Sequence, residues 1–181
     1  HPNIEVHIVD GTYESLIQQL LSADIDVIAG ALRPGAVAPD VSQHTLFEDE
    51  LVIVACCEHP CLAQSHLALS DLLQWEWVVP LQGTPASSAL EAAFAAQGLS
   101  PPKRQLQATS PALTQAFVSQ TERLAVASRG QALIEQAQGR LRVLPVPLAA
   151  SKRRIGTVVR SAGEPAPHLR LLLQACQQAV P

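Results

Sequence analysis

The chain has 181 residues, of which 48% are apolar and 15% are charged. This composition excludes an intrinsically disordered chain and predicts one globular domain or two small lobes. The formal net charge is only −4, but residues 1–100 carry thirteen acids and one base, whereas residues 101–181 carry three acids and eleven bases. The basic second half therefore raises the question of a nucleic-acid or other acidic partner.

The first predicted elements alternate between strand and helix. Apolar and polar residues alternate over residues 3–9, which is typical of a half-buried strand. A helix is expected over residues 12–21, with Thr12 as its N-cap, followed by a strand over residues 25–30. Strand, helix and strand in about thirty residues predict a parallel pair with a right-handed crossover.

The middle of the chain contains a continuous apolar run. Residues 51–57 predict a strand that is buried on both faces, and His59-Pro60 should stop it. A short helix over residues 67–73 and a strand over residues 75–80 follow. No apolar run approaches the ~20 residues that a membrane-spanning helix needs.

Three further helices have clear start signals. Thr84 and Ser110 each precede a proline, and proline is favoured at the first helical position because its missing N–H has no partner there anyway. Ser128 stands three residues before Gln131, the spacing of a capping box. Strands are expected over residues 105–108, 124–127, 141–146 and 155–160, and a last helix carries Leu169, Leu172, Leu173 and Cys176.

These helix starts predict where a ligand binds. In an open α/β sheet, helix N-termini emerge beside the carboxyl ends of strands, and their free N–H groups attract carboxylates and phosphates. Two or three starts that face one crevice would form a site for an anionic or polar small molecule. The alternative is that each hydroxyl only caps its own helix.

Motifs for catalysis or metal binding are weak. Residues 56–61 hold Cys56, Cys57, Glu58, His59 and Cys61, but adjacent cysteines on a strand point to opposite sides and the zinc-knuckle spacing is absent, so we expect buried thiols and no metal. The sequence contains no phosphate-binding glycine loop, no nucleophile elbow and no paired-histidine zinc motif. This pattern favours a binding module without a cofactor over an enzyme.

The order of several landmarks resembles the effector-binding domain of LysR-type transcriptional regulators. The matching segments are residues 3–6 with Gly11, 20–28, 50–54, 59–63, 69–72 and 155–158. Ala23 stands where the family usually has glycine, and Cys61 interrupts the usual His-Pro-Leu. The family's preceding strand and helix, and its winged helix-turn-helix, are not in this sequence, so we expect a regulatory fragment.

The resemblance implies the type 2 periplasmic-binding-protein-like α/β fold, in which two Rossmann-like lobes are joined by two crossovers around a ligand cleft. Lobe I would comprise residues 1–75 and 150–181, and lobe II residues 76–149. The expected effector-binding residues are Ala31, Leu32, Arg33, Gln82, Gly83, Thr84, Ser87, Thr109, Ser110, Ser128 and Arg129.

Arg33 is the strongest of these candidates. It is the only base in the first hundred residues, it follows a predicted strand, and a guanidinium pairs bidentately with a carboxylate. The alternative is an exposed loop arginine that balances nearby acids.

The resemblance implies a cytoplasmic sensor in which a small polar or anionic metabolite controls transcription. Its partners would be a second copy in a homodimer or homotetramer, and DNA only through the missing helix-turn-helix, with no membrane. The alternatives are a periplasmic solute-binding protein of the same fold and an enzyme of a related fold, such as a lyase or deaminase.

The predicted lobes also bear on the uneven charge. They would carry net charges of −6 and +2, which argues against a nucleic-acid surface and leaves a modest charge complementarity between lobes.

Overall fold

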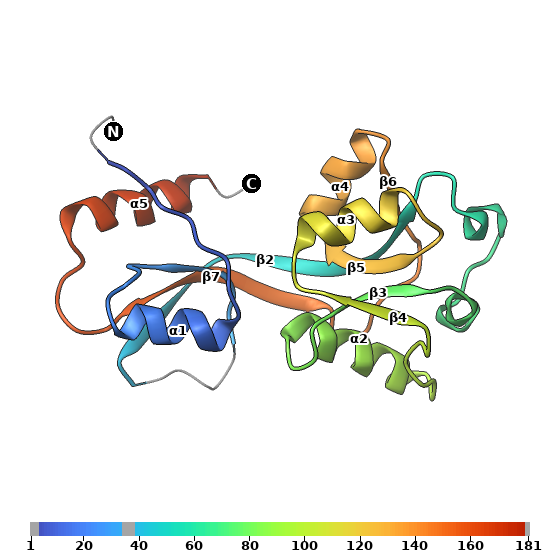
Figure 1. Cartoon of the computed structure of the whole chain (residues 1–181), viewed down its shortest axis with the longest axis horizontal. Helices are drawn as coiled ribbons and strands as arrows, with labels where there is room; N and C mark the ends of the chain where they lie inside the picture. Colours follow the sequence, from blue (N-terminus) through green and yellow to red (C-terminus); the bar gives the residue numbers. More distant parts are fainter. Residues whose placement is uncertain (1–3, 34–38, 180–181) are drawn as a thin grey trace. The chain divides into compact units, whose positions relative to one another are not determined.

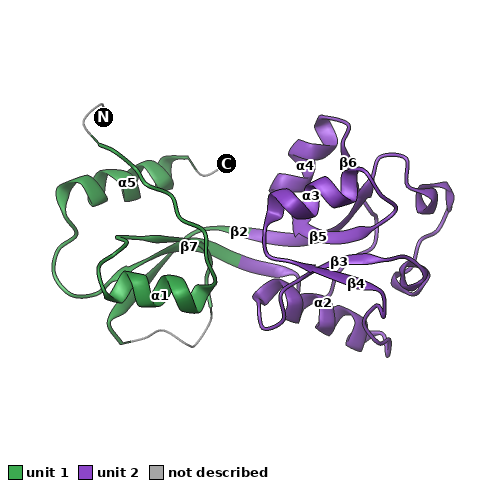
Figure 2. Ribbon diagram, in the orientation of Figure 1, with its two compact units in different colours: residues 1–48, 154–181 green, residues 49–153 purple. Residues whose placement is uncertain are grey.

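The computed structural model describes residues 4–33 and 39–179 (Figure 1). The chain forms two compact units (Figure 2): unit 1 comprises residues 1–48 and 154–181, and unit 2 comprises residues 49–153. This division differs from the predicted lobe boundaries because residues 49–75 and 150–153 belong to unit 2. Two 3₁₀ segments in that stretch, η1 (Pro60–Ala63) and η2 (Leu69–Gln74), bury Cys61, Leu69 and Leu72 in the unit 2 core.

Unit 2 is a mixed sheet with helices on both faces. The long strand β2 (Val41–Cys56) pairs antiparallel with β5 (Leu124–Ser128) and β6 (Leu141–Val143). β3 (Trp77–Pro80) pairs in parallel with β5 and with β4 (Gln105–Ala108). α2 (Pro85–Ala96) covers one face, and α3 (Pro111–Ser119) and α4 (Arg129–Ala137) cover the other (Figure 1).

The apolar side chains of β2 pack in two separate core clusters. Leu51, Ile53 and Ala55 pack in the cluster that contains the α2 side chains, whereas Val52 and Val54 pack in the cluster that contains α3 and α4 side chains. Successive strand residues point to opposite faces, so a strand with helices on both sides must be apolar throughout. The prediction of a strand buried on both faces is confirmed.

Two aromatic side chains anchor the α2 side of unit 2. Trp77 and Phe94 are both fully buried, and their rings meet edge to face with 5.8 Å between centroids. The indole N–H of Trp77 donates a hydrogen bond of 3.0 Å to the carbonyl oxygen of Leu72. Each large apolar side chain buried in this way stabilises the fold by roughly 1.5–3 kcal/mol.

Unit 1 is smaller. α1 (Tyr13–Leu21), which Thr12 caps as predicted, packs beside β1 (Ile28–Ala31), and β1 pairs antiparallel with β7 (Lys152–Arg160). A last helix, α5 (Pro167–Gln178), follows β7. The buried core cluster of the described part of unit 1 consists of Leu20, Ile28, Leu32, Val41 and Val158.

The predicted parallel strand pair at the start of the chain is wrong. Residues 4–10 form no strand, and Val6, Ile8 and Val9 are 55%, 87% and 51% exposed. Residue 3 of the predicted strand lies outside the described residues. The alternating pattern specifies two faces, but a strand also needs a neighbour for its N–H and C=O groups, and β1 obtains its neighbour from β7 in the antiparallel sense.

Gly156 marks a close backbone approach in unit 1. It lies opposite Gly30 in the β1–β7 register. A Cβ atom at Gly156 would collide with the carbonyl oxygen of His44 and lie 2.9 Å from Cδ1 of Leu32, whereas a Cβ atom at Gly30 would meet open space. Only glycine fits at position 156 without a shift of the neighbouring backbone.

None of the helices within residues 4–33 and 39–179 has the length and apolar character that a bilayer-spanning helix requires.

Candidate functional site

Three of the predicted helix starts begin at one edge of the unit 2 sheet. In the parallel register, Pro80 of β3 lies opposite Ala108 of β4, and Val78 lies opposite Ala125 of β5. Parallel neighbours end at the same edge, so the segments that lead into α2, α3 and α4 start beside one another. This arrangement brings together three of the predicted groups: residues 82–84, residues 109–110 and residues 128–129.

Thr84 and Ser110 cap their helices as predicted. The Thr84 hydroxyl oxygen accepts from the N–H of Ser87 at 3.2 Å and donates to the carbonyl oxygen of Leu81 at 2.8 Å. The Ser110 hydroxyl oxygen accepts from the N–H of Leu113 at 3.4 Å. Because these hydroxyls already serve their own helices, each helix start offers a ligand mainly backbone N–H groups and the positive end of the helix dipole.

The other candidates near α2 and α3 differ in exposure. Gln82 and Gly83 are exposed, and Gly83 has φ +82°, a left-handed conformation that suits glycine in the turn before the cap. Thr109 is exposed as well. Ser87 is buried, and its hydroxyl donates to Oε1 of Glu91 at 2.8 Å, so this side chain is occupied within its own helix.

Ser128 and Arg129, at the start of α4, contact carboxylates of β2. The Ser128 hydroxyl donates to Oδ1 of Asp49 at 2.9 Å, and Nε of Arg129 donates to Oε2 of Glu50 at 2.7 Å. The predicted capping box with Gln131 is wrong, because the Ser128 side chain makes no capping hydrogen bond. A stronger acceptor, the Asp49 carboxylate, takes that hydroxyl instead.

Asp49 also binds an arginine that the sequence did not single out. Nε and Nη2 of Arg153 lie 2.9 and 2.8 Å from Oδ2 of Asp49. The Asp49 side chain is 4% exposed, so its charge is almost fully removed from water and depends on these donors. Beside it, the Ser151 hydroxyl donates to Oε1 of Glu50 at 3.5 Å.

In unit 1, Arg33 is held by two residues of α1. Its Nη1 donates to Oε1 of Glu14 at 2.8 Å, and its guanidinium carbon lies 4.3 Å from the ring centroid of Tyr13. A backbone hydrogen bond at the start of α1, and then the charge of Arg33, lower the pKa of Glu14. The Tyr13 hydroxyl is buried and has no hydrogen-bond partner within the described residues.

Ala31 and Leu32 precede Arg33 and have structural contacts. Ala31 lies opposite Ile155 in the β1–β7 register. The Leu32 side chain is buried in the unit 1 core, and its N–H donates to the carbonyl oxygen of Arg154 at 2.9 Å. Leu32 could therefore reach a ligand only through its carbonyl oxygen.

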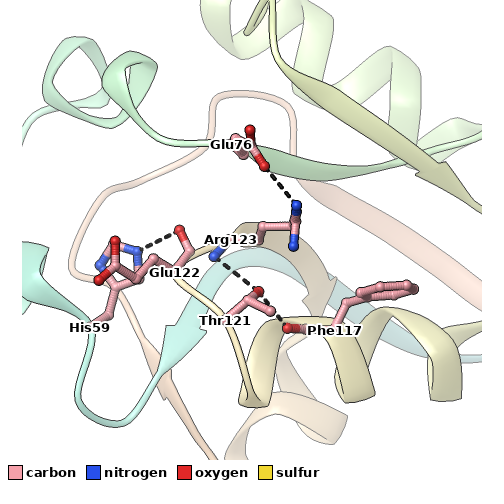
Figure 3. Close-up of polar contacts among 6 residues, drawn as sticks. All are labelled: His59, Glu76, Phe117, Thr121, Glu122 and Arg123. Carbon is pink, nitrogen blue, oxygen red and sulfur yellow. Dashed lines mark hydrogen bonds and ion pairs between the residues drawn. The ribbon is translucent and has the colours of Figure 1, made fainter.

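His59 uses both of its ring nitrogens within unit 2, and Figure 3 shows the contact of one of them with Glu122. Its Nδ1 accepts from the N–H of Cys61 at 3.1 Å, so the proton is on Nε2, which donates to the carbonyl oxygen of Glu122 at 3.0 Å. The imidazole ring also meets Trp75 edge to face at 4.5 Å. In residues 4–33 and 39–179, no three histidine, cysteine or acidic side chains gather as a metal site would require.

The turn that leads into β5 is fixed by neighbouring contacts, also drawn in Figure 3. The Thr121 hydroxyl donates to the carbonyl oxygen of Phe117 at 2.6 Å and accepts from the N–H of Arg123 at 3.3 Å. The Arg123 guanidinium donates to Oε2 of Glu76 at 2.7 Å. This Arg123 side chain, from the basic half of the chain, is thus paired with an acid of the first half.

Such pairing offsets part of the uneven charge along the chain. Among the described residues, four ion pairs join an arginine of the second half to an acid of the first half: Arg123–Glu76, Arg129–Glu50, Arg153–Asp49 and Arg160–Asp26. Counted by compact unit, unit 1 has eight acids and four bases, and unit 2 has eight of each. The net charges are −4 and 0, so the complementarity expected from the predicted lobes is reduced.

The whole chain, residues 1–181, matches the protein family described as the LysR substrate binding domain. It is 32% identical over 180 residues to the HTH-type transcriptional regulator GalR of Pseudomonas putida, which covers 99% of this chain and 45% of that protein. The chain spans about half the length of the curated relatives it matches.

Two solved structures support the fold. The regulatory domain of Synechocystis CcmR in complex with 2-PG has a TM-score of 0.79 at 17% identity, covering 99% of this chain and 85% of that one. The effector binding domain of QuiR in complex with shikimate has a TM-score of 0.73 at 16% identity, covering 94% and 78%. They confirm the predicted α/β fold of the type 2 periplasmic-binding-protein-like class. The chain belongs to the LysR substrate binding domain family.

Proposed function

We propose that this chain is the effector-sensing domain of a DNA-binding transcriptional regulator, and that its effector is a small polar or anionic metabolite. The family membership and the similarity to a transcriptional regulator support this proposal. The function requires binding only, with no catalytic step. A regulator of this kind acts in the cytoplasm, and its DNA contacts come from a helix-turn-helix outside this sequence.

One observation carries the choice of ligand class. Three parallel strands of unit 2 end at one sheet edge, and each is followed by a helix start that directs N–H groups and a positive dipole end outward. Within unit 1, the Arg33 guanidinium lies 4.3 Å from the Tyr13 ring centroid and pairs with Glu14, and it keeps further N–H groups for an anion. These groups suit a carboxylate or phosphate.

The proposed effector contacts are the candidates that keep hydrogen-bonding groups not taken up by their own fold contacts. In unit 1 they are the guanidinium N–H groups of Arg33 that Glu14 does not take, the backbone of Ala31 and the carbonyl oxygen of Leu32. In unit 2 they are the turn of Gln82, Gly83 and Thr84, the exposed Thr109, and the first-turn N–H groups after Ser110 and Ser128. The side chains of Ser87, Ser128 and Arg129 support the helix starts through Glu91, Asp49 and Glu50.

Titration calorimetry of the chain against shikimate, 2-PG and inorganic phosphate tests the proposal. Arg33→Ala should weaken binding of whichever anion binds by at least about tenfold, because a charge-assisted hydrogen bond contributes roughly 1.5–3 kcal/mol. Arg170→Ala is the matched control, since Arg170 is a half-exposed arginine of the same unit with its own acidic partner, Glu164. Equal affinities for the two variants would contradict a role for Arg33.

The regulatory role and the oligomeric state have separate tests. The full-length gene product should shift duplex DNA in a gel mobility assay, and the ligand identified above should change that affinity. A periplasmic solute-binding protein would bind the ligand but not the DNA. The proposed homodimer or homotetramer should appear in light scattering of the full-length protein at micromolar concentration, and a strict monomer would contradict it.

A further inference from the structure

The Asp49 carboxylate lies at a special point of the chain. The polypeptide enters unit 2 between Glu48 and Asp49 and leaves it between Arg153 and Arg154. Asp49 is therefore the first residue of unit 2 and Arg153 the last, and the two form an ion pair with N–O distances of 2.8 and 2.9 Å. This ion pair therefore links the two chain segments that connect the units, at the point where each segment reaches unit 2.

The same carboxylate holds the start of α4. Oδ2 takes both contacts from Arg153, which leaves Oδ1 for the Ser128 hydroxyl at 2.9 Å. The backbone brings these residues together, because Leu51 lies opposite Ser128 in the β2–β5 register and the N–H of Leu51 donates to the carbonyl oxygen of Ser151 at 3.1 Å. Three segments distant in sequence converge on Asp49.

Burial makes this arrangement stiff. An ionised carboxylate that is 4% exposed is stable only while its donors stay in place. A movement of Ser128 or of Arg153 would therefore leave a buried charge with fewer donors. The neighbouring pair between Glu50 and Arg129 lacks this property, because its side chains are 37% and 49% exposed and water can replace the contact.

We infer that Asp49 is a positioning residue that couples the start of α4 to the two connections between the compact units. A displacement at the start of α4 is passed through Ser128 and Asp49 to Arg153, next to the point where the chain leaves unit 2. This coupling is a property of the folded chain and does not depend on the proposed effector.

Hydrogen–deuterium exchange of the chain without any ligand tests the coupling. Asp49→Asn should raise amide exchange by about fivefold or more in two places, the first turn of α4 and residues 151–154, because local opening costs less once the ion pair is lost. Glu76→Gln is the matched control and should change neither place, because Glu76 belongs to a partly exposed ion pair of the same unit, with Arg123, that contacts neither α4 nor residues 151–154. Identical exchange in the two variants would overturn the inference.

A second variant separates coupling from a simple loss of stability. Ser128→Ala leaves the Asp49–Arg153 pair intact, yet it should raise exchange at residues 151–154 as well as in α4. Restoring the hydroxyl with Ser128→Thr should return both regions toward the original rates. A Ser128→Ala effect confined to α4 would overturn the coupling, and this holds even if Asp49→Asn does not fold.

Discussion

Replacing Gly156 by alanine should destabilise unit 1 sharply while leaving unit 2 intact. The new methyl group would overlap the carbonyl oxygen of His44 and lie 3.0 Å from the carbonyl carbon of that residue and 2.9 Å from Cδ1 of Leu32. Extra carbon in a packed site typically costs roughly 1–3 kcal/mol. Because the main obstacle is backbone, which cannot rotate away, we expect about 3 kcal/mol, the upper end of this range.

Gly30 supplies a control at the paired position. It lies opposite Gly156 in the same strand pair, but a Cβ atom there meets nothing within 4 Å. Gly30→Ala should therefore be neutral or stabilise the protein by roughly 0.4–1 kcal/mol, because alanine reduces the freedom of the unfolded chain. Similar free energies of unfolding for the two variants would refute the close-approach argument.

The two units can be followed separately in one experiment. Both tryptophans, Trp75 and Trp77, lie in unit 2, so their fluorescence reports the unfolding of that unit in urea. Amide exchange in β1 and β7 reports unit 1, where a loss of about 3 kcal/mol should accelerate exchange roughly a hundredfold. Gly156→Ala should change the second signal far more than the first.

Three other predictions concern single side chains. Burial raises the pKa of the Cys61 thiol to about 11. Thiol reagents near pH 8 should therefore label the exposed Cys57 and spare Cys61. The free energy of unfolding should also fall as pH rises above about 8.5, because the Cys61 thiol then ionises in the unfolded chain but not in the folded one. Phe94→Ala should cost roughly 3–5 kcal/mol in urea unfolding, because Phe94 is fully buried. The pKa of Glu14 is lowered by a backbone hydrogen bond and by Arg33. The ionised Glu14 carboxylate therefore stabilises the fold at neutral pH, and this stabilisation is lost as pH falls below about 4. Glu14→Gln should remove this pH dependence from urea unfolding midpoints measured across that range.

Elements with local signals were predictable from the sequence. The starts of α2 and α3 follow from Thr84 and Ser110, each placed before a proline, since capping and the missing N–H act within one helical turn. The two-faced burial of β2 follows from its continuous apolar run. The strand expected over residues 3–9 failed because pairing is a long-range property that an alternating pattern does not contain.

The site was predictable only in part, for the same reason. The sequence directs attention to Arg33, but its partners Tyr13 and Glu14 are fixed by the packing of α1 beside β1. Ser128 has a local capping-box spacing, and a carboxylate 79 residues away takes its hydroxyl instead. Asp49 could have been noticed as an acid close to the start of a buried apolar run, although the neighbouring sequence does not indicate that Arg153 is its partner.

The division of the chain into units constrains the order in which the protein folds. Unit 2 is one uninterrupted stretch of 105 residues, whereas unit 1 is assembled from both ends of the chain, and its strand pair joins Ile28 to Val158. Closing so long a loop carries a large entropic cost unless the intervening residues are already compact. During synthesis, unit 1 must wait until β7 has left the ribosome, so unit 2 folds first and brings together the two ends that complete unit 1.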